Sequence, residues 1–274
     1  MSRSCALTDL TTSALGIRHD PSSATEGSSQ TLVLVNSLGT TTRMWDQLLE
    51  VLTARVDVVR FELRGHGSNV TRTPFGLDDL VDDLVEVLDA TGVDRAHLAG
   101  ISLGGMTAIR AAARFPGRVA SLAVICAAPV LPRDTWLQRA AAVRAAGLGP
   151  LVPTVTKRWF TEAFVRRSPE VVRAFVGMLR ATDPAGYSLA CDLLADADVR
   201  PDLPSITAPT LVIGGREDTA TPPSDQRLIA HGIADARLMI LDDVAHMAPA
   251  AAPERIASAM LDHTGSPEMP GKSA

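Results

Sequence analysis

The stretch LAGISLGGM, at residues 98–106, contains the motif G-x-S-x-G centred on Ser102. Apolar residues precede the motif and helix-forming residues follow it, which predicts a strand, a sharp turn and a helix. So tight a turn strains the backbone of its serine, and a Cβ at Gly100 or Gly104 would collide with the neighbouring chain. We therefore predict that the Ser102 hydroxyl projects from the carboxyl end of a sheet. The Leu103 N–H and the start of the helix then face any anion that forms there.

The motif also arises by chance, so its meaning depends on two partners elsewhere in the chain. A serine hydroxyl becomes a nucleophile when a base removes its proton and a carboxylate orients that base. After such a turn the carboxylate comes first along the chain and the histidine second. Asp218 follows an apolar strand expected at 209–214, and His246 follows the next one, expected at 236–241. These residues predict a triad of Ser102, Asp218 and His246.

Two other residues compete for these roles. Glu217 stands beside Asp218, and we favour Asp218 because the adjacent acid would face away if the loop leaves its strand as usual. Among the six histidines, His66 is the competitor of His246. It lies in the sequence RGHGS, where we interpret it as a structural residue that holds the loop.

Acyl transfer also needs hydrogen-bond donors for the oxyanion. The Leu103 N–H is one candidate. The loop after the first buried strand supplies the second donor in sites of this kind, and here that loop reads NSLGT, residues 36–40. The Leu38 N–H is therefore the predicted second donor.

The order of elements predicts an α/β fold with a mostly parallel central sheet flanked by helices. Apolar runs rich in β-branched residues mark strands buried on both faces, and they alternate with segments of helical period. The expected strands are 31–35, 56–63, the residues 96–99 that lead into the motif, 119–126, 209–214 and 236–241. The expected helices are 45–52, 77–91, 106–115, 136–146, 157–166, 169–181, 187–195 and 253–263.

The alternation of strands and helices fails between residues 129 and 201, where the pattern is helical throughout. Because strands return afterwards, we predict an inserted helical cap at 129–201 rather than a separate C-terminal domain. The α/β core then consists of 1–128 and 202–263, with a disordered tail at 264–274. Two short edge strands are expected at the start of the core, at 7–10 and 14–18.

Composition narrows the classes of partner. The chain has 274 residues, a formal charge of −5, no basic cluster and no apolar run long enough to cross a membrane, so we expect neither nucleic acid nor membrane as a partner. The three cysteines are scattered, which predicts neither a disulfide framework nor a metal site. The first ten residues lack the pattern of a secretion signal, so we expect a cytoplasmic protein.

Taken together, these segments resemble the α/β-hydrolase superfamily over nearly the whole chain. The form NSLGT followed by Met44 and Trp45 resembles the 3-oxoadipate enol-lactonases, also called β-ketoadipate enol-lactone hydrolases, of aromatic catabolism. Further matching segments are GGMT (104–107), AAVR (141–144), RWFT (158–161), DADVR (196–200) and ATPP (220–223). Residues 247–254 depart from the pattern, because they lack the acidic residue that usually precedes the proline.

The resemblance implies a Ser-His-Asp acyl-enzyme mechanism on a small enol lactone that carries a carboxylate, with no cofactor and no metal. That carboxylate needs a cation and an apolar wall, and Arg133 with Trp136 is the predicted pair. Other cap candidates are Arg139, Arg144, Arg158 and Trp159. Two alternatives stay open, a carboxylesterase or perhydrolase of broad small-substrate range and a non-catalytic ligand receptor. A homo-oligomer is also left open.

Overall fold

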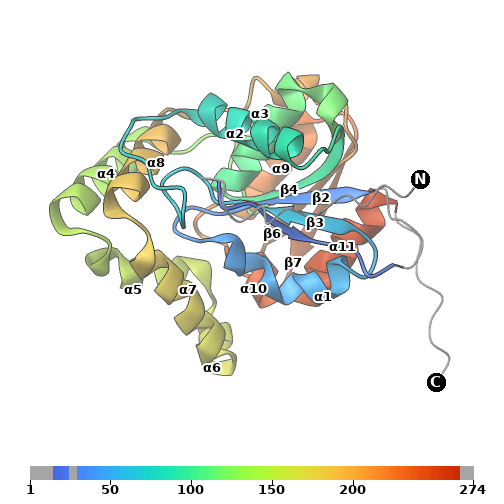
Figure 1. Cartoon of the computed structure of the whole chain (residues 1–274). Coiled ribbons are helices and arrows are strands. Elements are labelled where there is room, and N and C mark those ends of the chain that lie inside the picture. Colours follow the sequence, from blue (N-terminus) through green and yellow to red (C-terminus); the bar gives the residue numbers. More distant parts are fainter. Residues whose placement is uncertain (1–14, 25–29, 266–274) are drawn as a thin grey trace, which may run out of the picture.

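A computed structural model of the chain describes residues 15–24 and 30–265 (Figure 1). The edge strand expected at 7–10, most of the tail expected from 264 and the first cysteine lie outside these residues. In the described parts, no helix is both long and apolar enough to cross a membrane.

A seven-stranded sheet forms the centre of the molecule. Its strands are β1 (Arg18–Asp20), β2 (Thr31–Val35), β3 (Asp57–Arg60), β4 (Ala96–Ile101), β5 (Val119–Ile125), β6 (Thr210–Gly215) and β7 (Ala236–Leu241). They lie in the order β1-β3-β2-β4-β5-β6-β7, and all neighbours are parallel except β1, which pairs antiparallel with β3. Every residue of β2, β4 and β6 is buried, as expected for strands covered on both faces. The predicted mostly parallel sheet is confirmed.

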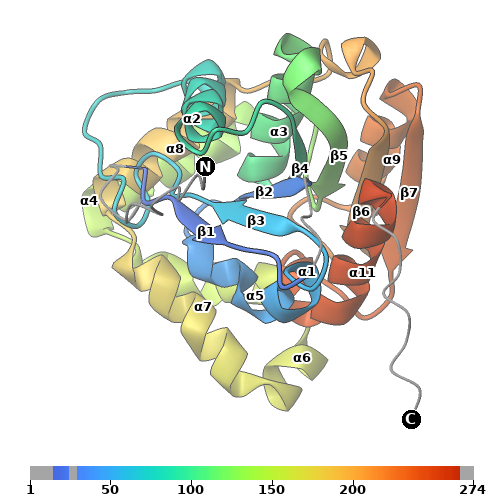
Figure 2. The ribbon, with the colours of Figure 1, turned by 45° about the vertical axis from the view of Figure 1, so that its right-hand side comes forward.

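Helices cover both faces of this sheet, with α2, α3 and α9 on one face and α1, α10 and α11 on the other (Figures 1 and 2). The helices of the core are α1 (Leu49–Leu52), α2 (Leu77–Ala90), α3 (Leu103–Arg114), α9 (Pro223–Gly232), α10 (Ala248–Ala251) and α11 (Pro253–Thr264). Short 3-10 helices lie at Thr42–Leu48, Pro116–Arg118, Gly149–Leu151 and Leu203–Ser205.

Several predicted boundaries are wrong. The segment expected as one helix at 45–52 is a 3-10 helix followed by the single turn α1, and Trp45 inside it is tied to Asn36 by a 2.9 Å hydrogen bond. The edge strand expected at 14–18 is β1, which begins at Arg18 and pairs with β3. The last helix extends to Thr264, where Gly265 ends it at a φ of 72°.

Five helices between β5 and β6 pack together beyond the carboxyl ends of the strands, in the region drawn green to yellow in Figure 1. They are α4 (Arg133–Ala146), α5 (Val152–Trp159), α6 (Glu162–Arg167), α7 (Pro169–Ala181) and α8 (Pro184–Asp196). The single helix expected at 157–166 is instead two helices, because Phe160 is extended and the Thr161 hydroxyl caps α6 by accepting the Phe164 N–H at 3.1 Å. We call these five helices the cap.

The strand order reverses at β2, because β3 lies on one side of it and β4 on the other. This switch point determines where the candidate site lies. From β2 the chain moves to β3 on one side and then to β4 on the other, so the loops after β2 and β4 begin side by side, with Val35 paired to Gly100. In parallel sheets such a switch point opens a crevice at the carboxyl ends of the strands. The loop 36–40 and Ser102 meet there, beneath the cap.

Candidate active site

Ser102 occupies the sharp turn between β4 and α3. Its φ of 56° and ψ of −116° lie where a residue with a side chain is strained, and its N–H donates to the Ile125 carbonyl at 3.0 Å. A Cβ at Gly100 would lie 2.1 Å from the Gly104 oxygen, and a Cβ at Gly104 would lie 2.3 Å from the Val35 oxygen. Only glycine fits at these two positions, as the motif predicts.

Asp218 and His246 are in direct contact, although they follow different strands. Asp218 Oδ2 lies 2.8 Å from His246 Nδ1, and both residues are buried. An ionised carboxylate only accepts hydrogen bonds, so this pair places the proton of a neutral imidazole on Nδ1 and leaves Nε2 as a proton acceptor.

Thr221 and the loop around it hold the Asp218 carboxylate from the other side. Oδ1 accepts the backbone N–H groups of Ala220 at 2.8 Å and Thr221 at 3.0 Å, and Oδ2 accepts the Thr221 hydroxyl at 2.8 Å. Burial by itself would raise the pKa of Asp218, but the charge and hydrogen bond of His246 and the bonds from Thr221 outweigh it and lower that pKa. The carboxylate is therefore ionised and fixed in orientation.

The two competitors lie elsewhere. Glu217 Oε2 accepts the Val244 N–H at 2.9 Å, so this acid binds the backbone of the loop after β7, whereas the His246 ring pairs with Asp218. His66 accepts the Gly39 N–H on Nε2 at 2.9 Å, and its Nδ1 lies 3.0 Å from the Arg64 carbonyl. It therefore touches the loop that carries Leu38 without lining the cavity.

The two predicted oxyanion donors lie near Ser102: Leu103 follows it in the chain, and Leu38 lines the same cavity. Leu103 is the first residue of α3, so its N–H has no acceptor within the helix. Leu38 lies in the loop after β2, where Thr40 donates its N–H at 3.3 Å and its hydroxyl at 2.7 Å to the Ser37 carbonyl. The Leu38 N–H has no such acceptor among the described residues. Both amides remain predicted donors.

A cavity of about 420 Å³ lies between the cap and the core, next to Ser102. On the core side it is lined by Ser37, Leu38, Ser102, Thr219, Ala220, Thr221, Pro222, Asp225 and His246. On the cap side it is lined by Val130, Leu131, Pro132, Thr135, Trp136, Arg139, Val155, Arg158, Trp159 and Tyr187. Ser102, His246, two arginines and an apolar wall thus share one space, of the size that takes small molecules.

The sequence profile of the alpha/beta hydrolase fold matches residues 30–253. The chain belongs to this family. It is 36% identical over 213 residues to 3-oxoadipate enol-lactonase 2 of Acinetobacter baylyi, covering 77% of this chain and 80% of the relative. The crystal structure of the enol-lactonase from Burkholderia xenovorans superposes with a TM-score of 0.88 at 30% identity, covering 93% and 99%. A malate-bound esterase from Thermogutta terrifontis gives 0.83 at 25% identity, covering 90% and 92%.

These findings confirm the resemblance stated from the sequence: the chain is a hydrolase similar to enol-lactonases. The chain is also similar to an esterase, so membership of the family does not identify the substrate. The residues that line the cavity supply the further evidence.

The arginines of the hydrolase cap fall into two groups. Arg139 and Arg158 line the cavity, and the Arg139 guanidinium lies 4.5 Å from the centre of the Trp136 ring. Burial raises the pKa of Tyr187 to about 12, and the charges of these two arginines oppose that rise, so all three groups are close in space. Arg133 is absent from the lining. It pairs with Asp196 at 2.9 Å on the surface, with its side chain 60% exposed.

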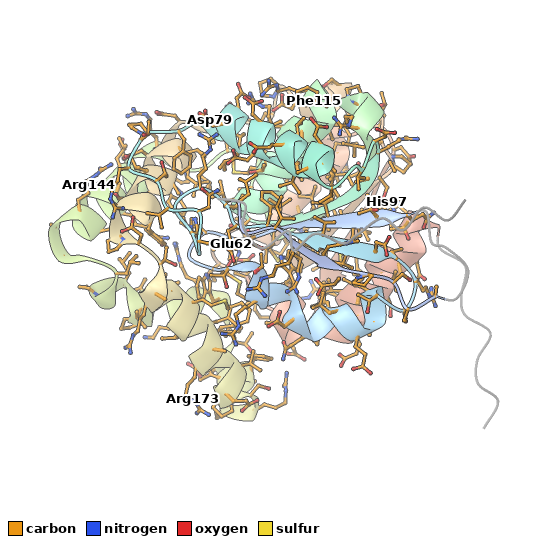
Figure 3. All side chains as sticks on the ribbon, in the orientation of Figure 1. Glu62, Asp79, His97, Phe115, Arg144 and Arg173 are labelled. Atoms are coloured by element: carbon orange, nitrogen blue, oxygen red, sulfur yellow. The ribbon has the colours of Figure 1, made fainter. Side chains whose placement is uncertain are left out.

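Trp136 therefore lines the cavity, but Arg133, its predicted partner, does not. Arg144 pairs with Asp192, also away from the cavity, on the outer side of the cap in Figure 3. Arg139 and Arg158 were only candidates among several at the level of sequence.

Asp225 lines the cavity but is not among the site residues predicted from the sequence. It is in the first turn of α9, and burial, helped by the negative charge of Asp218, raises its pKa. Its position in the first helical turn after two prolines was the available signal, since helical side chains lean toward the start of their helix. In the described residues, no group of three or more His, Cys, Asp or Glu side chains is arranged to hold a metal ion.

Proposed function

We propose that this hydrolase cleaves a small lactone or ester that carries a carboxylate, and that the enol lactone of 3-oxoadipate is its substrate. The observation that supports the proposal is the composition of the cavity, in which Ser102 and His246 share one space with Arg139 and Arg158. A planar guanidinium can bind a carboxylate through two hydrogen bonds and so orient the lactone. The similar enol-lactonases, and the similar esterase that binds malate, a small dicarboxylate, support the same substrate class.

In the proposed mechanism, Ser102 Oγ attacks the lactone carbonyl while His246 Nε2 takes its proton. Asp218 stabilises the resulting imidazolium, and the N–H groups of Leu38 and Leu103 bind the oxyanion. The ring C–O bond then breaks, the enol leaves with a proton from His246, and it tautomerises to a ketone. Because an enolate is a better leaving group than an alkoxide, this step needs little acid assistance.

Water completes the cycle. His246 removes a proton from a water molecule as its oxygen attacks the acyl carbon, and the new tetrahedral intermediate expels Ser102 as it regains its proton. The released product carries a second carboxylate. No step of this sequence requires a metal or an organic cofactor.

The direct test compares kcat/KM on the enol lactone with kcat/KM on p-nitrophenyl acetate. Wild type, Ser102→Ala and Ser205→Ala are measured, the last as a control because Ser205 is exposed and its hydroxyl bonds only to the Asp202 carbonyl. We expect the lactone to be preferred by about a hundredfold or more and Ser102→Ala to lower its turnover by about 10⁴-fold or more. A lactone that is not turned over would contradict the proposed substrate.

A broad carboxylesterase is the second candidate. Val130, Leu131 and Pro132 form an apolar wall of the cavity, and the Asp225 carboxylate faces the same space. Both features favour a neutral ester over an anion. Efficient, Ser102-dependent turnover of p-nitrophenyl acetate with a silent lactone would establish this alternative. If neither substrate is turned over and a fluorophosphonate does not label Ser102, the remaining interpretation is a non-catalytic ligand receptor.

A further inference from the structure

The orientation of the Leu38 N–H depends on two neighbouring peptide planes. The Ser37 carbonyl accepts two hydrogen bonds from Thr40. Because a peptide unit is planar and its N–H points opposite to its C=O, these bonds also orient the Leu38 N–H. The next peptide unit carries the Gly39 N–H, which donates to His66 Nε2 at 2.9 Å. Thr40 and His66 therefore fix the backbone on the two sides of Leu38.

The surroundings of His66 allow its Nε2 to act only as the acceptor of this bond. His66 is 1% exposed, and its Nδ1 lies 3.0 Å from the Arg64 carbonyl, which only accepts hydrogen bonds. Nδ1 therefore carries the proton and Nε2 presents a lone pair to Gly39. Burial lowers the pKa of His66 to about 4, so the ring stays neutral at ordinary pH. A proton on Nε2 would face the Gly39 N–H directly.

The loop has little freedom to compensate for a lost bond at Gly39. Gly39 has a φ of 75°, and a Cβ there would lie 2.8 Å from the Leu179 side chain and 3.2 Å from that of Tyr187. The cap thus packs closely over this residue while His66 holds it from the core. With the acceptor removed, the buried Gly39 N–H would be left without a partner, and the cost of this unpaired donor would displace the peptide that joins Leu38 to Gly39.

We propose that His66 is a positioning residue for acyl transfer, because its bond to Gly39 holds the Leu38 N–H in place for the oxyanion. This inference rests on the proposed Ser102 chemistry. His66 touches neither the cavity nor the substrate, so it acts through the loop. Its effect therefore belongs to the transition state, where the oxyanion forms, and not to substrate binding.

Two substitutions separate the acceptor of the ring from its donor. In His66→Gln the side-chain oxygen can reach the place of Nε2, which keeps an acceptor for Gly39. In His66→Asn the amide NH₂ can replace Nδ1, which keeps the donor to Arg64 but leaves Gly39 without an acceptor. We expect His66→Gln to retain kcat within about threefold. We expect His66→Asn and His66→Ala to lose about 10- to 100-fold in kcat with KM nearly unchanged, since removal of a whole oxyanion donor costs about 10²- to 10³-fold.

His97 provides a matched control. It is also a buried histidine whose pKa burial lowers to about 4, and its Nδ1 lies 2.8 Å from the Ser121 hydroxyl. Figure 3 shows it at the end of the sheet remote from the cap. We expect His97→Asn to destabilise the fold without lowering kcat.

The decisive readout is inhibition by a short-chain trifluoromethyl ketone, which forms an oxyanion when a serine adds to it. We expect its Ki to rise in His66→Asn by the same factor as kcat falls, and the Ki of a plain carboxylate ligand to stay constant. A His66→Asn enzyme that keeps wild-type kcat, or that loses kcat without weakening the ketone, would overturn the inference. If wild type shows no Ser102-dependent turnover of lactone or ester, the proposed function fails and the inference falls with it.

Discussion

The backbones of Gly65 and Gly186 touch across the junction of cap and core. A Cβ added to Gly186 would lie 2.5 Å from Gly65 Cα, and a Cβ added to Gly65 would lie 2.7 Å from Gly186 Cα. Gly65 also has a φ of 80° and directly precedes His66. Helix α8 of the cap therefore packs directly on the turn that carries His66, whose ring binds the loop 36–40. A displacement of either backbone must move the other.

This contact predicts the effect of one added methyl group. We expect Gly186→Ala to lower the free energy of unfolding by about 1–3 kcal/mol, as overpacking does, and to lower kcat because the turn at Gly65 must move. Urea unfolding and steady-state kinetics measure the two effects. Gly177→Ala is the control: Gly177 lies on α7 with no atom within 4 Å of its added Cβ, and alanine there should stabilise the helix by about 0.5–1 kcal/mol. If Gly186→Ala and Gly177→Ala have the same free energy of unfolding and the same kcat, the backbones of Gly65 and Gly186 are not in close contact.

The two groups of cap arginines predict opposite outcomes for the same substitution. We expect Arg139→Gln to raise KM for the carboxylated lactone about tenfold, because a charged hydrogen bond is worth about 1.5–3 kcal/mol, while KM for p-nitrophenyl acetate stays the same. Arg133→Gln should leave both unchanged, since Arg133 pairs with Asp196 outside the cavity. An equal rise of KM for both substrates in Arg139→Gln would show that the arginine supports the cap rather than the substrate carboxylate.

Asp225 opposes the arginines from the core side of the cavity. Its carboxylate carries a negative charge into a space proposed to bind an anion. We expect Asp225→Asn to lower KM for the carboxylated lactone by about threefold at low ionic strength, less at high salt, with little effect on a neutral ester. Asp196→Asn removes the same charge on the outer surface of the cap and should change neither value. A higher KM in Asp225→Asn would mean that Asp225 contacts the substrate favourably.

The contact of Asp218 with His246 could be anticipated because it depends on a general property of parallel sheets. Loops that follow successive strands emerge at one edge, so an acid after β6 and a histidine after β7 must lie close together. Ser102 could be placed for the same reason, from a motif that requires glycine on both sides. These inferences use only local sequence and the order of strands.

The cavity wall could not be predicted in the same way. Arg133 and Arg139 each lie three residues from Trp136, so helical period puts both on its face of α4. They lie on opposite sides of Trp136, and Arg133, on the side away from the cavity, pairs with Asp196 of α8, which is distant in the sequence. A role for His66 in holding its loop was predicted, but its partner Gly39 depends on how the loops after β2 and β3 meet. The orientation of these side chains depends on packing between segments that are distant in the sequence, so no local sequence pattern predicts it.

The burial of His66 predicts how the free energy of unfolding depends on pH. The pKa of His66 is about 4 in the folded chain, against 6.5 for an unperturbed histidine. Between these values the unfolded chain binds a proton that the folded chain does not, so the free energy of unfolding decreases as pH falls through this window. One pKa unit corresponds to about 1.4 kcal/mol, so His66 accounts for a loss of about 3 kcal/mol between pH 6.5 and 4, with no further loss from this residue below pH 4.

Substitution isolates that contribution from the other groups that titrate in the same range. We expect the urea-derived free energy of unfolding of His66→Gln to depend less on pH than that of wild type, so that the difference between the two proteins shrinks as pH falls from 7 to 4.5. His231→Gln changes an exposed histidine on α9 and should follow the wild-type curve. If His66→Gln and wild type remain parallel over this range, His66 is not held neutral by burial, and the one-directional bond to Gly39 loses its physical basis.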